Sequence, residues 1–331
     1  MLTVAAIIPH WNRRDLLEPL FTSLRAQTHP FNEIILVDNG STDDSADLAE
    51  HLNATVVRLE SNLGFAAAVN RGIESTTADW IAILNNDVTL APDWLEQLLT
   101  NADADGFATG KILNAADHSI LDATFDEISR AACAWRCGQG KPDAPIWNQL
   151  RQIRIAPMTA AIFRRSLFSE LGPLDESFGS YLEDVDFGIR CALSGRHGVY
   201  IPTAVAYHRG SATWGAWNKD TVRQISRNQI LLAAKHFKGE PRWPIVAGQV
   251  LWGLVALRHL RGVSYLRGKI SGWNTARAIY RDKTTASVVC ISRDRISSIA
   301  KSSEREIFAL QRQTGFDRYW RAYFWLLPRS S

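Results

Sequence analysis

The sequence has few cysteines and no stretch that marks an exported or disordered protein. Its four cysteines have neither CxxC spacing nor the density of a disulfide scaffold, which predicts reduced thiols in the cytoplasm (Cys133, Cys137, Cys191 and Cys290). The first residues enter an apolar stretch without the basic region or cleavage site of a signal peptide. No long low-complexity linker is present, and 46% hydrophobic with 21% charged residues is typical of a folded globular protein.

Two glycine-rich phosphate-binding motifs are also missing. After the first apolar stretch the sequence has Pro9-His-Trp-Asn12 where a dinucleotide-binding enzyme has GxGxxG, and GxxxxGK[ST] occurs nowhere. A classical NAD enzyme and a P-loop NTPase are therefore not expected.

What the sequence does have is an alternation of short apolar stretches with helical segments. Strands are predicted at residues 3–8, 33–37, 55–59, 80–84 and 155–165, and helices at residues 16–27 and 45–52. This order predicts an α/β fold with a doubly wound, mostly parallel, Rossmann-like sheet. Residues 117–145 follow no clear period and are not assigned.

The most informative stretch is a predicted buried strand, Trp80–Leu84, that ends in Asn85-Asn86-Asp87. Ligands of parallel sheets bind at this carboxyl edge. Asp87 could hold Mg²⁺ between protein and phosphate oxygens, while the two asparagines add oxygen ligands or hydrogen bonds. Asp38, at the end of another predicted strand, faces the same edge. Taken alone, Asn-Asn-Asp is also an ordinary turn into the next helix.

Two later stretches add ionisable side chains. Glu183, Asp184 and Asp186 stand at the start of a predicted amphipathic helix, where acids favour the positive end of the helix dipole. That explanation does not account for three acids in four positions beside an aromatic turn. His208 ends a predicted strand, and it is either an ordinary core or surface histidine or the partner of Asp87 in a metal site.

In their order along the chain these motifs resemble the family 2 glycosyltransferases, which have the GT-A nucleotide-sugar fold. The matching motifs are Pro9-His-Trp-Asn12, Val37-Asp38-Asn-Gly-Ser-Thr-Asp43, Asn62-x-Gly64-Phe65 with Asn70-x-Gly72, Leu84-Asn-Asn-Asp87-Val, Leu174-Asp-Glu-Ser-Phe178, Tyr181-Leu-Glu-Asp184-Val-Asp186 and Tyr207-His208. They cover roughly the first two thirds of the chain. The Leu-Asn-Asn-Asp-Val and Glu-Asp-Val-Asp forms are similar to those of the rhamnosyltransferase branch.

The resemblance implies a role for each matched position. Asp38 would contact the nucleotide base, and Asp184 would be the general base. Asp87 and His208 would hold a divalent metal, Mg²⁺ or Mn²⁺. Asn85 replaces the first acid of the family's DxD motif, which leaves one carboxylate for the metal there. The other positions implied in donor binding are Pro9, Asn12, Asn62, Gly64, Asn70, Asn85 and Asn86.

These roles predict an inverting, metal-dependent transfer of a sugar to a lipid-linked glycan acceptor in cell-surface polysaccharide synthesis. By resemblance the donor is dTDP-L-rhamnose. A UDP-hexose is the alternative, because Asp38 can bind the imide N–H that thymine and uracil share. A sugar-1-phosphate nucleotidyltransferase would be expected to show a Gly-rich, Arg-containing loop after the first strand. A non-enzymatic carbohydrate-binding module would not need Asp87 together with Asp184.

The net charge of +3 is divided unevenly along the chain. Residues 1–234, the predicted nucleotide-sugar-binding and catalytic domain, carry 19 Lys and Arg against 28 Asp and Glu, whereas residues 235–331 carry 18 against 6. Seven of the twelve tryptophans lie at or after Trp214. Such a basic, Trp-rich helical extension suits the headgroup layer of an anionic membrane.

The extension contains an apolar segment, Trp243 to Arg258, that is too short and too interrupted for a membrane span. Flanking cations are Arg258, Arg261, Arg267 and Lys269. We therefore expect a cytoplasmic enzyme that is peripheral on the inner face of the cytoplasmic membrane. Packing on the catalytic domain or on a second subunit is the alternative, and nucleic acid is not an expected partner.

Overall fold

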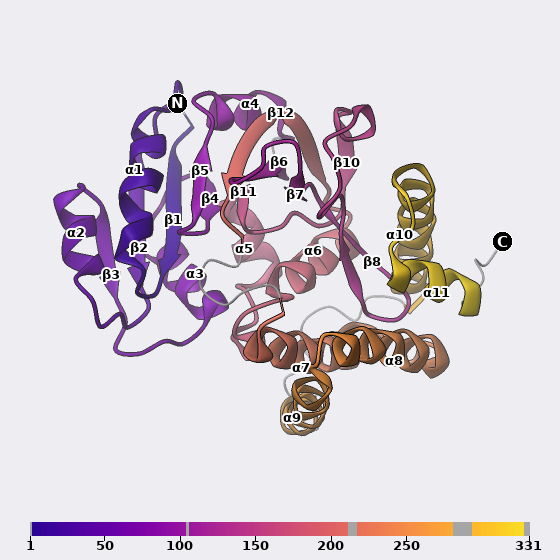
Figure 1. Ribbon diagram of the computed structural model, residues 1–331. Coiled ribbons are helices and arrows are strands. Elements are labelled where there is room, and N and C mark those ends of the chain that lie inside the picture. Colours follow the sequence, from indigo (N-terminus) through magenta and orange to yellow (C-terminus); the bar gives the residue numbers. More distant parts are fainter. Residues whose placement is uncertain (1, 104–105, 211–216, 281–292, 328–331) are drawn as a thin grey trace. The chain divides into compact units, whose positions relative to one another are not determined.

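The computed structural model describes residues 2–103, 106–210, 217–280 and 293–327 (Figure 1). The chain forms two compact units, one of Met1–Asp126 with Arg136–Thr213 and one of Glu127–Trp135 with Trp214–Ser331. Cys290 and Trp214, which entered the predictions above, lie outside the described residues; the other three cysteines are free and buried. The functional division at residue 234 stays a prediction.

The first unit is built on a ten-stranded mixed sheet. Its main order is β10-β12-β6-β11-β4-β1-β2-β3, with β5 paired to β12 and β7 to β6. The strands are β1 (Val4–His10), β2 (Glu33–Asp38), β3 (Thr55–Arg58), β4 (Trp80–Leu84), β5 (Val88–Leu90), β6 (Phe107–Asn114), β7 (Leu121–Ala123), β10 (Arg151–Ile153), β11 (Ala160–Arg164) and β12 (Gly198–His208). A separate two-stranded sheet joins β8 (Asp126–Ile128) and β9 (Ala134–Arg136).

Helices connect these strands. The α-helices of the first unit are α1 (Leu17–Arg25), α2 (Ser45–His51), α3 (Phe65–Glu74), α4 (Trp94–Asn101), α5 (Arg165–Leu171) and α6 (Glu183–Leu193). Short 3₁₀ turns lie at Arg14–Leu16, Pro145–Trp147 and Glu176–Phe178.

The predicted parallel alternation is confirmed for the first four strands. β1 pairs in parallel with both β2 and β4, and His10 stands opposite Asp38 in the register. All five residues of β4 are buried, as its unbroken apolar sequence indicates. The carboxyl ends of β4, β1 and β2 therefore follow one another along one edge of the sheet.

The next part of the sheet is not parallel throughout. β11 runs antiparallel to both of its neighbours, β4 and β6. Between β6 and β11 the chain makes only short strands and a 3₁₀ turn, without a crossover helix. A parallel strand needs such a crossover to return to the starting edge. β11 instead starts beside the end of β4, where the N–H of Asn85 donates to the carbonyl of Thr159 (2.9 Å).

A bulge in β12 positions the end of that strand. The parallel register of β12 with β6 shifts between Ile201 and Val205. Gly110 lies opposite the bulge, and a Cβ there would be 1.8 Å from the carbonyl oxygen of Ala204. After the bulge, β12 also pairs with β5, which places His208 opposite Val88. Because Val88 follows Asp87 directly, the predicted metal ligands come from neighbouring strand ends.

Helix α6 begins at Glu183 as predicted, but every one of its residues is buried. The prediction of an amphipathic helix is therefore wrong in one respect, since α6 has no solvent-facing side. Asp186 and Arg190 of this helix pair with each other in the interior, which sequence periodicity does not reveal.

The second unit is helical, which confirms the predicted helical extension. Its helices are α7 (Lys219–His236), α8 (Arg242–Arg258), α9 (Gly262–Tyr280), α10 (Arg293–Thr314) and α11 (Arg318–Leu326). Within residues 2–103, 106–210, 217–280 and 293–327, no helix is both long and apolar enough to span a bilayer. Lys269, predicted as a surface cation, is instead partly buried, and its ammonium donates to Gln229 (2.7 Å) and Gln249 (2.8 Å).

Candidate functional site

A line of three ionisable side chains comes from the turn between β4 and β5, from β7 and from the end of β12. His208 Nε2 is 3.0 Å from Asp87 Oδ1, and His208 Nδ1 is 2.8 Å from Asp122 Oδ2. All three side chains are largely buried. Burial alone would lower the pKa of His208, but the hydrogen bonds to Asp122 and Asp87 outweigh it and raise the pKa to about 9. The structure thus brings the two predicted metal ligands into contact.

These side chains fit a divalent metal. A carboxylate on one ring nitrogen is the usual partner of a histidine that binds metal through its other nitrogen, because it fixes the tautomer and the ring orientation. Asp122 is the carboxylate that contacts Nδ1 of His208, and Nε2 of the same ring faces Asp87. Within the described part of the chain, no cluster of three or more His, Cys, Asp or Glu side chains could hold a metal. Further ligands would therefore be water and phosphate oxygens, as Mg²⁺ and Mn²⁺ accept.

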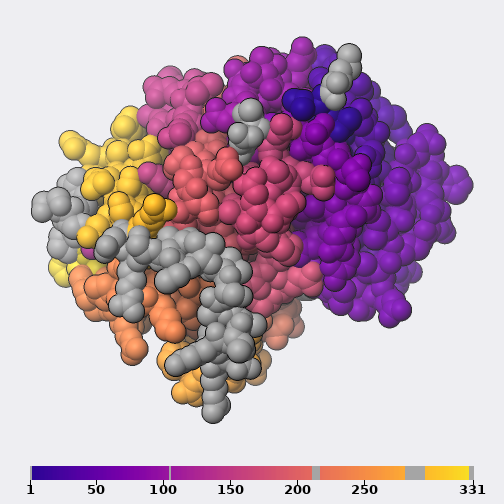
Figure 2. Space-filling view, turned by 180° about the vertical axis from the view of Figure 1, so that it is seen from behind, coloured from indigo at the N-terminus to yellow at the C-terminus, as the bar shows by residue number. Residues whose placement is uncertain are grey.

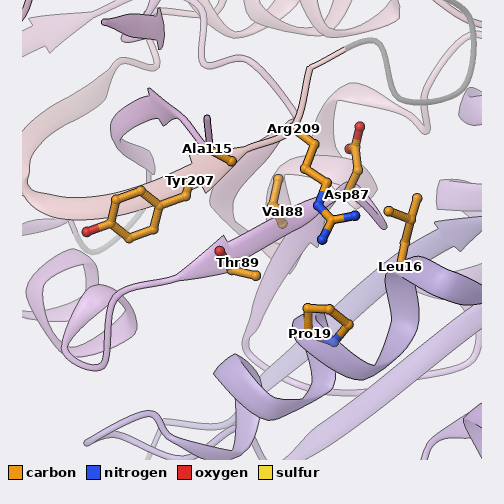
Figure 3. A pocket seen from close by; sticks show the side chains of 8 residues that line it. All are labelled: Leu16, Pro19, Asp87, Val88, Thr89, Ala115, Tyr207 and Arg209. Carbon is orange, nitrogen blue, oxygen red and sulfur yellow. The ribbon is translucent and has the colours of Figure 1, made fainter. Parts of the chain in front are cut away.

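A pocket of about 230 Å³ opens beside Asp87 (Figure 3). It is lined by Leu16, Pro19, Asp87, Val88, Thr89, Ala115, Tyr207 and Arg209. Asp87 and Arg209 come from strand ends that are tied together, since the N–H of Arg209 donates to the carbonyl of Asp87 (3.0 Å). The pocket therefore presents a carboxylate and a guanidinium next to the predicted metal ligands.

The loops after β1 and β2 are held together by side chains from the predicted motifs. Asn12 accepts at Oδ1 from the N–H of Thr42 (2.9 Å), and its own N–H donates to the hydroxyl of Ser41 (2.8 Å). Asp38, nearly buried, accepts at Oδ1 from the N–H of Ser41 (3.2 Å). Its predicted contact with a nucleotide base stays a prediction, but the carboxylate is fixed at the sheet edge.

Asn62 and Gly64 close the next loop onto the end of β2. The Asn39 amide donates to Asn62 Oδ1 (3.1 Å) and to the carbonyl of Gly64 (3.1 Å). Gly64 has a φ of 93°, and a Cβ on it would lie 2.8 Å from the carbonyl oxygen of Gly179. A glycine is needed there for both reasons.

The stretch Pro9–His10 meets Asn85–Asn86 across neighbouring strands. The Asn86 amide donates to His10 Nδ1 (3.0 Å), and burial lowers the pKa of His10 to about 4. The imidazole is therefore neutral and acts as an acceptor for Asn86. Pro9 stands one position before the end of β1, opposite Val37. These contacts hold the loop that carries Asp87.

Asn70 is more deeply buried than a residue that contacts the nucleotide-sugar donor needs to be. Its Oδ1 accepts from the N–H of Leu174 (2.9 Å), and its Nδ2 donates to the carbonyl of Leu174 (2.9 Å) and to Glu176 (3.1 Å). The side chain thus joins α3 to the segment that precedes α6. Its predicted contact with the donor stays a prediction.

The predicted general base, Asp184, lies at the start of α6. Its Oδ1 accepts from the N–H of Val185 (2.8 Å), and its Oδ2 is 3.7 Å from the guanidinium of Arg136. The chain enters the helix through Tyr181 and Leu182, both with positive φ (71° and 68°). Such backbone strain is common where a side chain must be held in one place.

Glu183 and Asp184 are adjacent buried acids with different surroundings. Burial raises the pKa of Glu183 well above its ordinary value, and the charge of Asp184 raises it further. Burial also raises the pKa of Asp184, but Arg136 opposes the rise. Of the two acids, Glu183 has the more strongly raised pKa and keeps its proton more readily, whereas Arg136 favours the ionised form of Asp184.

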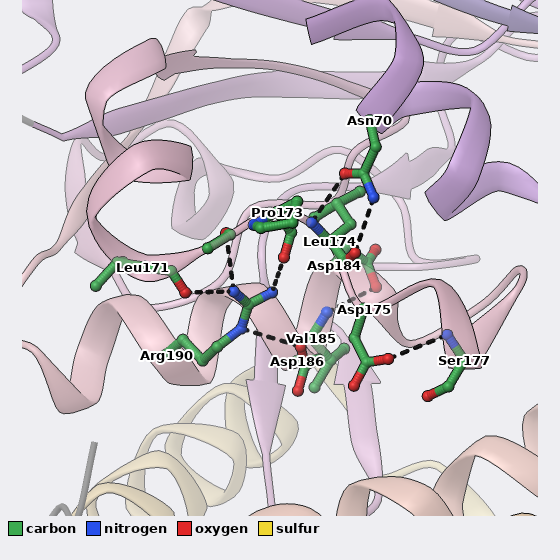
Figure 4. A network of polar contacts seen from close by, with 11 residues as sticks. Asn70, Leu171, Pro173, Leu174, Asp175, Ser177, Asp184, Val185, Asp186 and Arg190 are labelled. Atoms are coloured by element: carbon green, nitrogen blue, oxygen red, sulfur yellow. Dashed lines mark hydrogen bonds and ion pairs between the residues drawn. The ribbon is translucent and has the colours of Figure 1, made fainter. Parts of the chain in front are cut away.

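Asp186 has a structural role. Its carboxylate binds Arg190 Nε (3.1 Å), and the same guanidinium donates to the carbonyls of Leu171 (2.8 Å) and Pro173 (2.9 Å) (Figure 4). Arg190 thus ties α6 to the end of α5 and to the loop after it. This network fixes the helix from which Asp184 projects.

Two residues of this site have no signal in the sequence. Asp122 and Arg136 both lie in the segment that follows no period. Arg136 lies 3.6 Å from Asp126, and its charge acts on Asp184 and on Asp122. It therefore links the predicted base electrostatically to the partner of His208.

Comparisons with known proteins agree with the resemblance. A family model described as "Glycosyl transferase family 2" matches residues 5–172. An N-acetylglucosaminyl-diphospho-decaprenol L-rhamnosyltransferase of Mycobacterium tuberculosis is 29% identical, with 76% of this chain and 90% of that protein covered.

Two solved structures are similar in fold. GalNAc-T7 with UDP, GalNAc and Mn²⁺ has a TM-score of 0.63 at 15% identity, covering 95% of this chain and 58% of that one. A mannosyltransferase from Pyrobaculum calidifontis with GDP-Man and Mn²⁺ has a TM-score of 0.53 at 17% identity, covering 99% and 88%. These likenesses confirm the predicted GT-A fold.

Arg136→Met should destabilise the protein in a pH-dependent way. The variant removes the cation that lies beside Asp126 and Asp184. We expect its free energy of unfolding near pH 8 to be lower by about 2 kcal/mol. This loss is smaller than for a fully buried ion pair, because the guanidinium is 30% exposed. Below the ordinary pKa of an aspartate, Asp184 is protonated in both the folded and the unfolded protein, and this loss of stability vanishes. The cost grows as pH rises through the raised folded pKa.

Urea unfolding at about pH 5 and about pH 8 measures this difference. Arg196→Met removes an exposed ion pair with Glu170 and is the matched control, with an expected change of about 0–1 kcal/mol at both pH values. An equal loss of stability by Arg136→Met at both pH values would contradict the electrostatic role.

Proposed function

The chain belongs to glycosyl transferase family 2, and we propose that it is an inverting, metal-dependent enzyme that transfers a sugar from a nucleotide sugar to a lipid-linked glycan. The observation that carries the proposal is the contact of Asp87 with His208, backed by Asp122, at the carboxyl edge of the sheet. A nucleotidyltransferase or a binding module offers no reason for that arrangement together with Asp184 beside Arg136 at the start of α6.

The division of roles follows from charge. Asp87 and His208 would hold Mg²⁺ or Mn²⁺, which would offset the negative charge that develops on the diphosphate. Asp38 would accept from the imide N–H of the base, and its fixed position supports that role. Arg209 adds a cation to the pocket beside Asp87.

Asp184 would take the proton from the attacking acceptor hydroxyl. A general base must be ionised at working pH and close to its proton, and a moderately raised pKa makes it a better acceptor. Arg136 favours the first condition, because its charge lowers the pKa of Asp184 against the effect of burial. Arg190 and Asp186 keep its helix in place.

The identities of the donor and the acceptor are inferred from similarity to a relative. The relative from Mycobacterium tuberculosis is named as an L-rhamnosyltransferase of N-acetylglucosaminyl-diphospho-decaprenol. By analogy we propose dTDP-L-rhamnose as donor, a lipid-linked glycan as acceptor, and a role in cell-wall or other cell-surface polysaccharide synthesis at the inner face of the cytoplasmic membrane. A UDP-hexose remains the second candidate donor.

Incubation with dTDP-L-rhamnose and with UDP-hexoses should release a nucleoside diphosphate only from the true donor. Release of pyrophosphate would instead indicate a nucleotidyltransferase. Isothermal titration with dTDP and UDP compares the bases directly, and tighter binding of UDP would count against the rhamnosyl assignment.

Asp184→Asn should lower turnover about a hundred- to ten-thousand-fold, because the proton acceptor is lost while the side chain keeps its volume. Donor binding should be nearly unchanged in a titration with nucleoside diphosphate. Glu183→Gln is the matched control next to it. Burial raises the pKa of Glu183 well above its ordinary value, so the amide, which is neutral like the protonated acid, should keep most of the activity. The reverse pattern, with Glu183→Gln inactive and Asp184→Asn active, would exchange the two assignments.

Asp122→Asn should raise the Mn²⁺ concentration needed for half-maximal activity about 10- to 100-fold, because the carboxylate no longer fixes the His208 ring. Activity in the wild type should be abolished by EDTA and restored by Mn²⁺ or Mg²⁺. Asp117→Asn is the control, since this exposed carboxylate caps a turn at Ser119 in the same segment. Full activity of the wild type in chelator would mean that no metal is required.

A further inference from the structure

Helices α8 and α9 each expose a line of large apolar side chains. On α8 the exposed residues follow helical spacing, and α9 repeats the pattern. They are Trp243, Val246, Val250, Leu254 and Leu257 on α8, Leu260 in the turn, and Val263, Leu266, Ile270 and Trp273 on α9; each is between 52% and 86% exposed. We call these ten residues the α8–α9 apolar face; both helices are orange in Figure 2 and reach the molecular surface in that view.

The inward sides of the same helices carry small and polar residues. Gly248, Gln249 and Ala256 of α8 are buried, and so are Gly268, Gly272 and Ala276 of α9. Gly268 and Gly272 are close to α7, where a Cβ would lie 2.3 Å and 2.5 Å from the carbonyl oxygens of Arg223 and Arg227. Lys269 is also turned inward. This is the reverse of a water-facing amphipathic helix, which points its large apolar residues inward.

The charged residues of α8, of α9 and of the turn between them have one sign. Residues 241–280 contain six Lys and Arg and no Asp or Glu. Arg242 and Arg258 are exposed beside the ends of the α8 line, and Arg267 and Arg277 are exposed on α9. Arg277 stacks on Trp273 at 5.3 Å. Aromatic rings with arginines at the edge of an apolar surface suit the headgroup layer of a bilayer.

We propose that the α8–α9 apolar face inserts into the headgroup layer of an anionic membrane and lies in its plane. An anionic surface is the occupant because it pairs with every cation around the face. A second copy of this chain would instead bring like charges together. The inference rests on the proposed function for its link to a lipid-linked acceptor, but binding to vesicles needs no transfer reaction.

Co-sedimentation with vesicles tests the proposal on the full chain. The wild type should bind vesicles of phosphatidylcholine and phosphatidylglycerol in roughly equal parts more strongly than pure phosphatidylcholine, and should bind less in high salt. Leu254→Glu and Leu266→Glu should each lower the partition coefficient about ten-fold, because a leucine no longer enters the lipid and a negative charge is added. Leu150→Glu makes the same change at a 61% exposed leucine of the first unit, and its partition coefficient should equal that of the wild type.

Nucleoside diphosphate binding by each variant shows that it is folded. Wild-type partitioning by both Leu254→Glu and Leu266→Glu would overturn the proposal, and so would a wild type that stays in the supernatant with anionic vesicles. A wild-type dimer that Leu254→Glu converts to a monomer in light scattering would assign the face to a second copy instead. Failure of sugar transfer with intact vesicle binding would reject the proposed function and leave this inference standing.

Discussion

The first unit depends on how it neutralises the carboxylates that it buries. A buried charge without a partner is costly, and a pair is stable only with good geometry and further hydrogen bonds. His208 lies between Asp87 and Asp122, Arg136 lies between Asp126 and Asp184, and Arg190 holds Asp186. Burial and the charge of Asp184 raise the pKa of Glu183 well above its ordinary value, although the charge of Arg136 opposes the rise. The positions of these cations therefore favour the ionised form of some buried acids over others.

The sequence predicts much of this arrangement because its signals are local. Unbroken apolar stretches such as Trp80–Leu84 predict buried parallel strands, and polar residues at their ends predict the active edge. The reversed direction of β11 is not predicted, because it depends on the absence of a crossover helix in residues 115–159, where periodicity is weak. Asp122 and Arg136 are not predicted for the same reason. Each lies in short irregular structure and acts on residues far away in the sequence.

The motifs predict positions better than they predict contacts. Asn62 and Asn70 stand where the resemblance puts them, yet both side chains hydrogen-bond within the protein. Asn62 closes a loop onto Asn39, and Asn70 links α3 to Leu174 just ahead of α6. Asn70 uses both its carbonyl oxygen and its amide nitrogen in such bonds, and the bonds of Asn62 are made by its carbonyl oxygen. Such residues can matter to a site by setting the backbone around it, and a motif alone does not separate the two roles.

The outward direction of the apolar residues in α9 follows from its close approach to α7. Gly268 and Gly272 face carbonyl oxygens of α7 at distances where no other side chain fits, and Lys269 reaches Gln229 and Gln249 from the same side. Rotating the helix to bury Leu266 or Ile270 would push a large side chain into those carbonyls and leave the ammonium without its acceptors. The sequence thus specifies one orientation of α9. That orientation leaves its largest apolar side chains exposed, which a helix selected only for contact with water would not do.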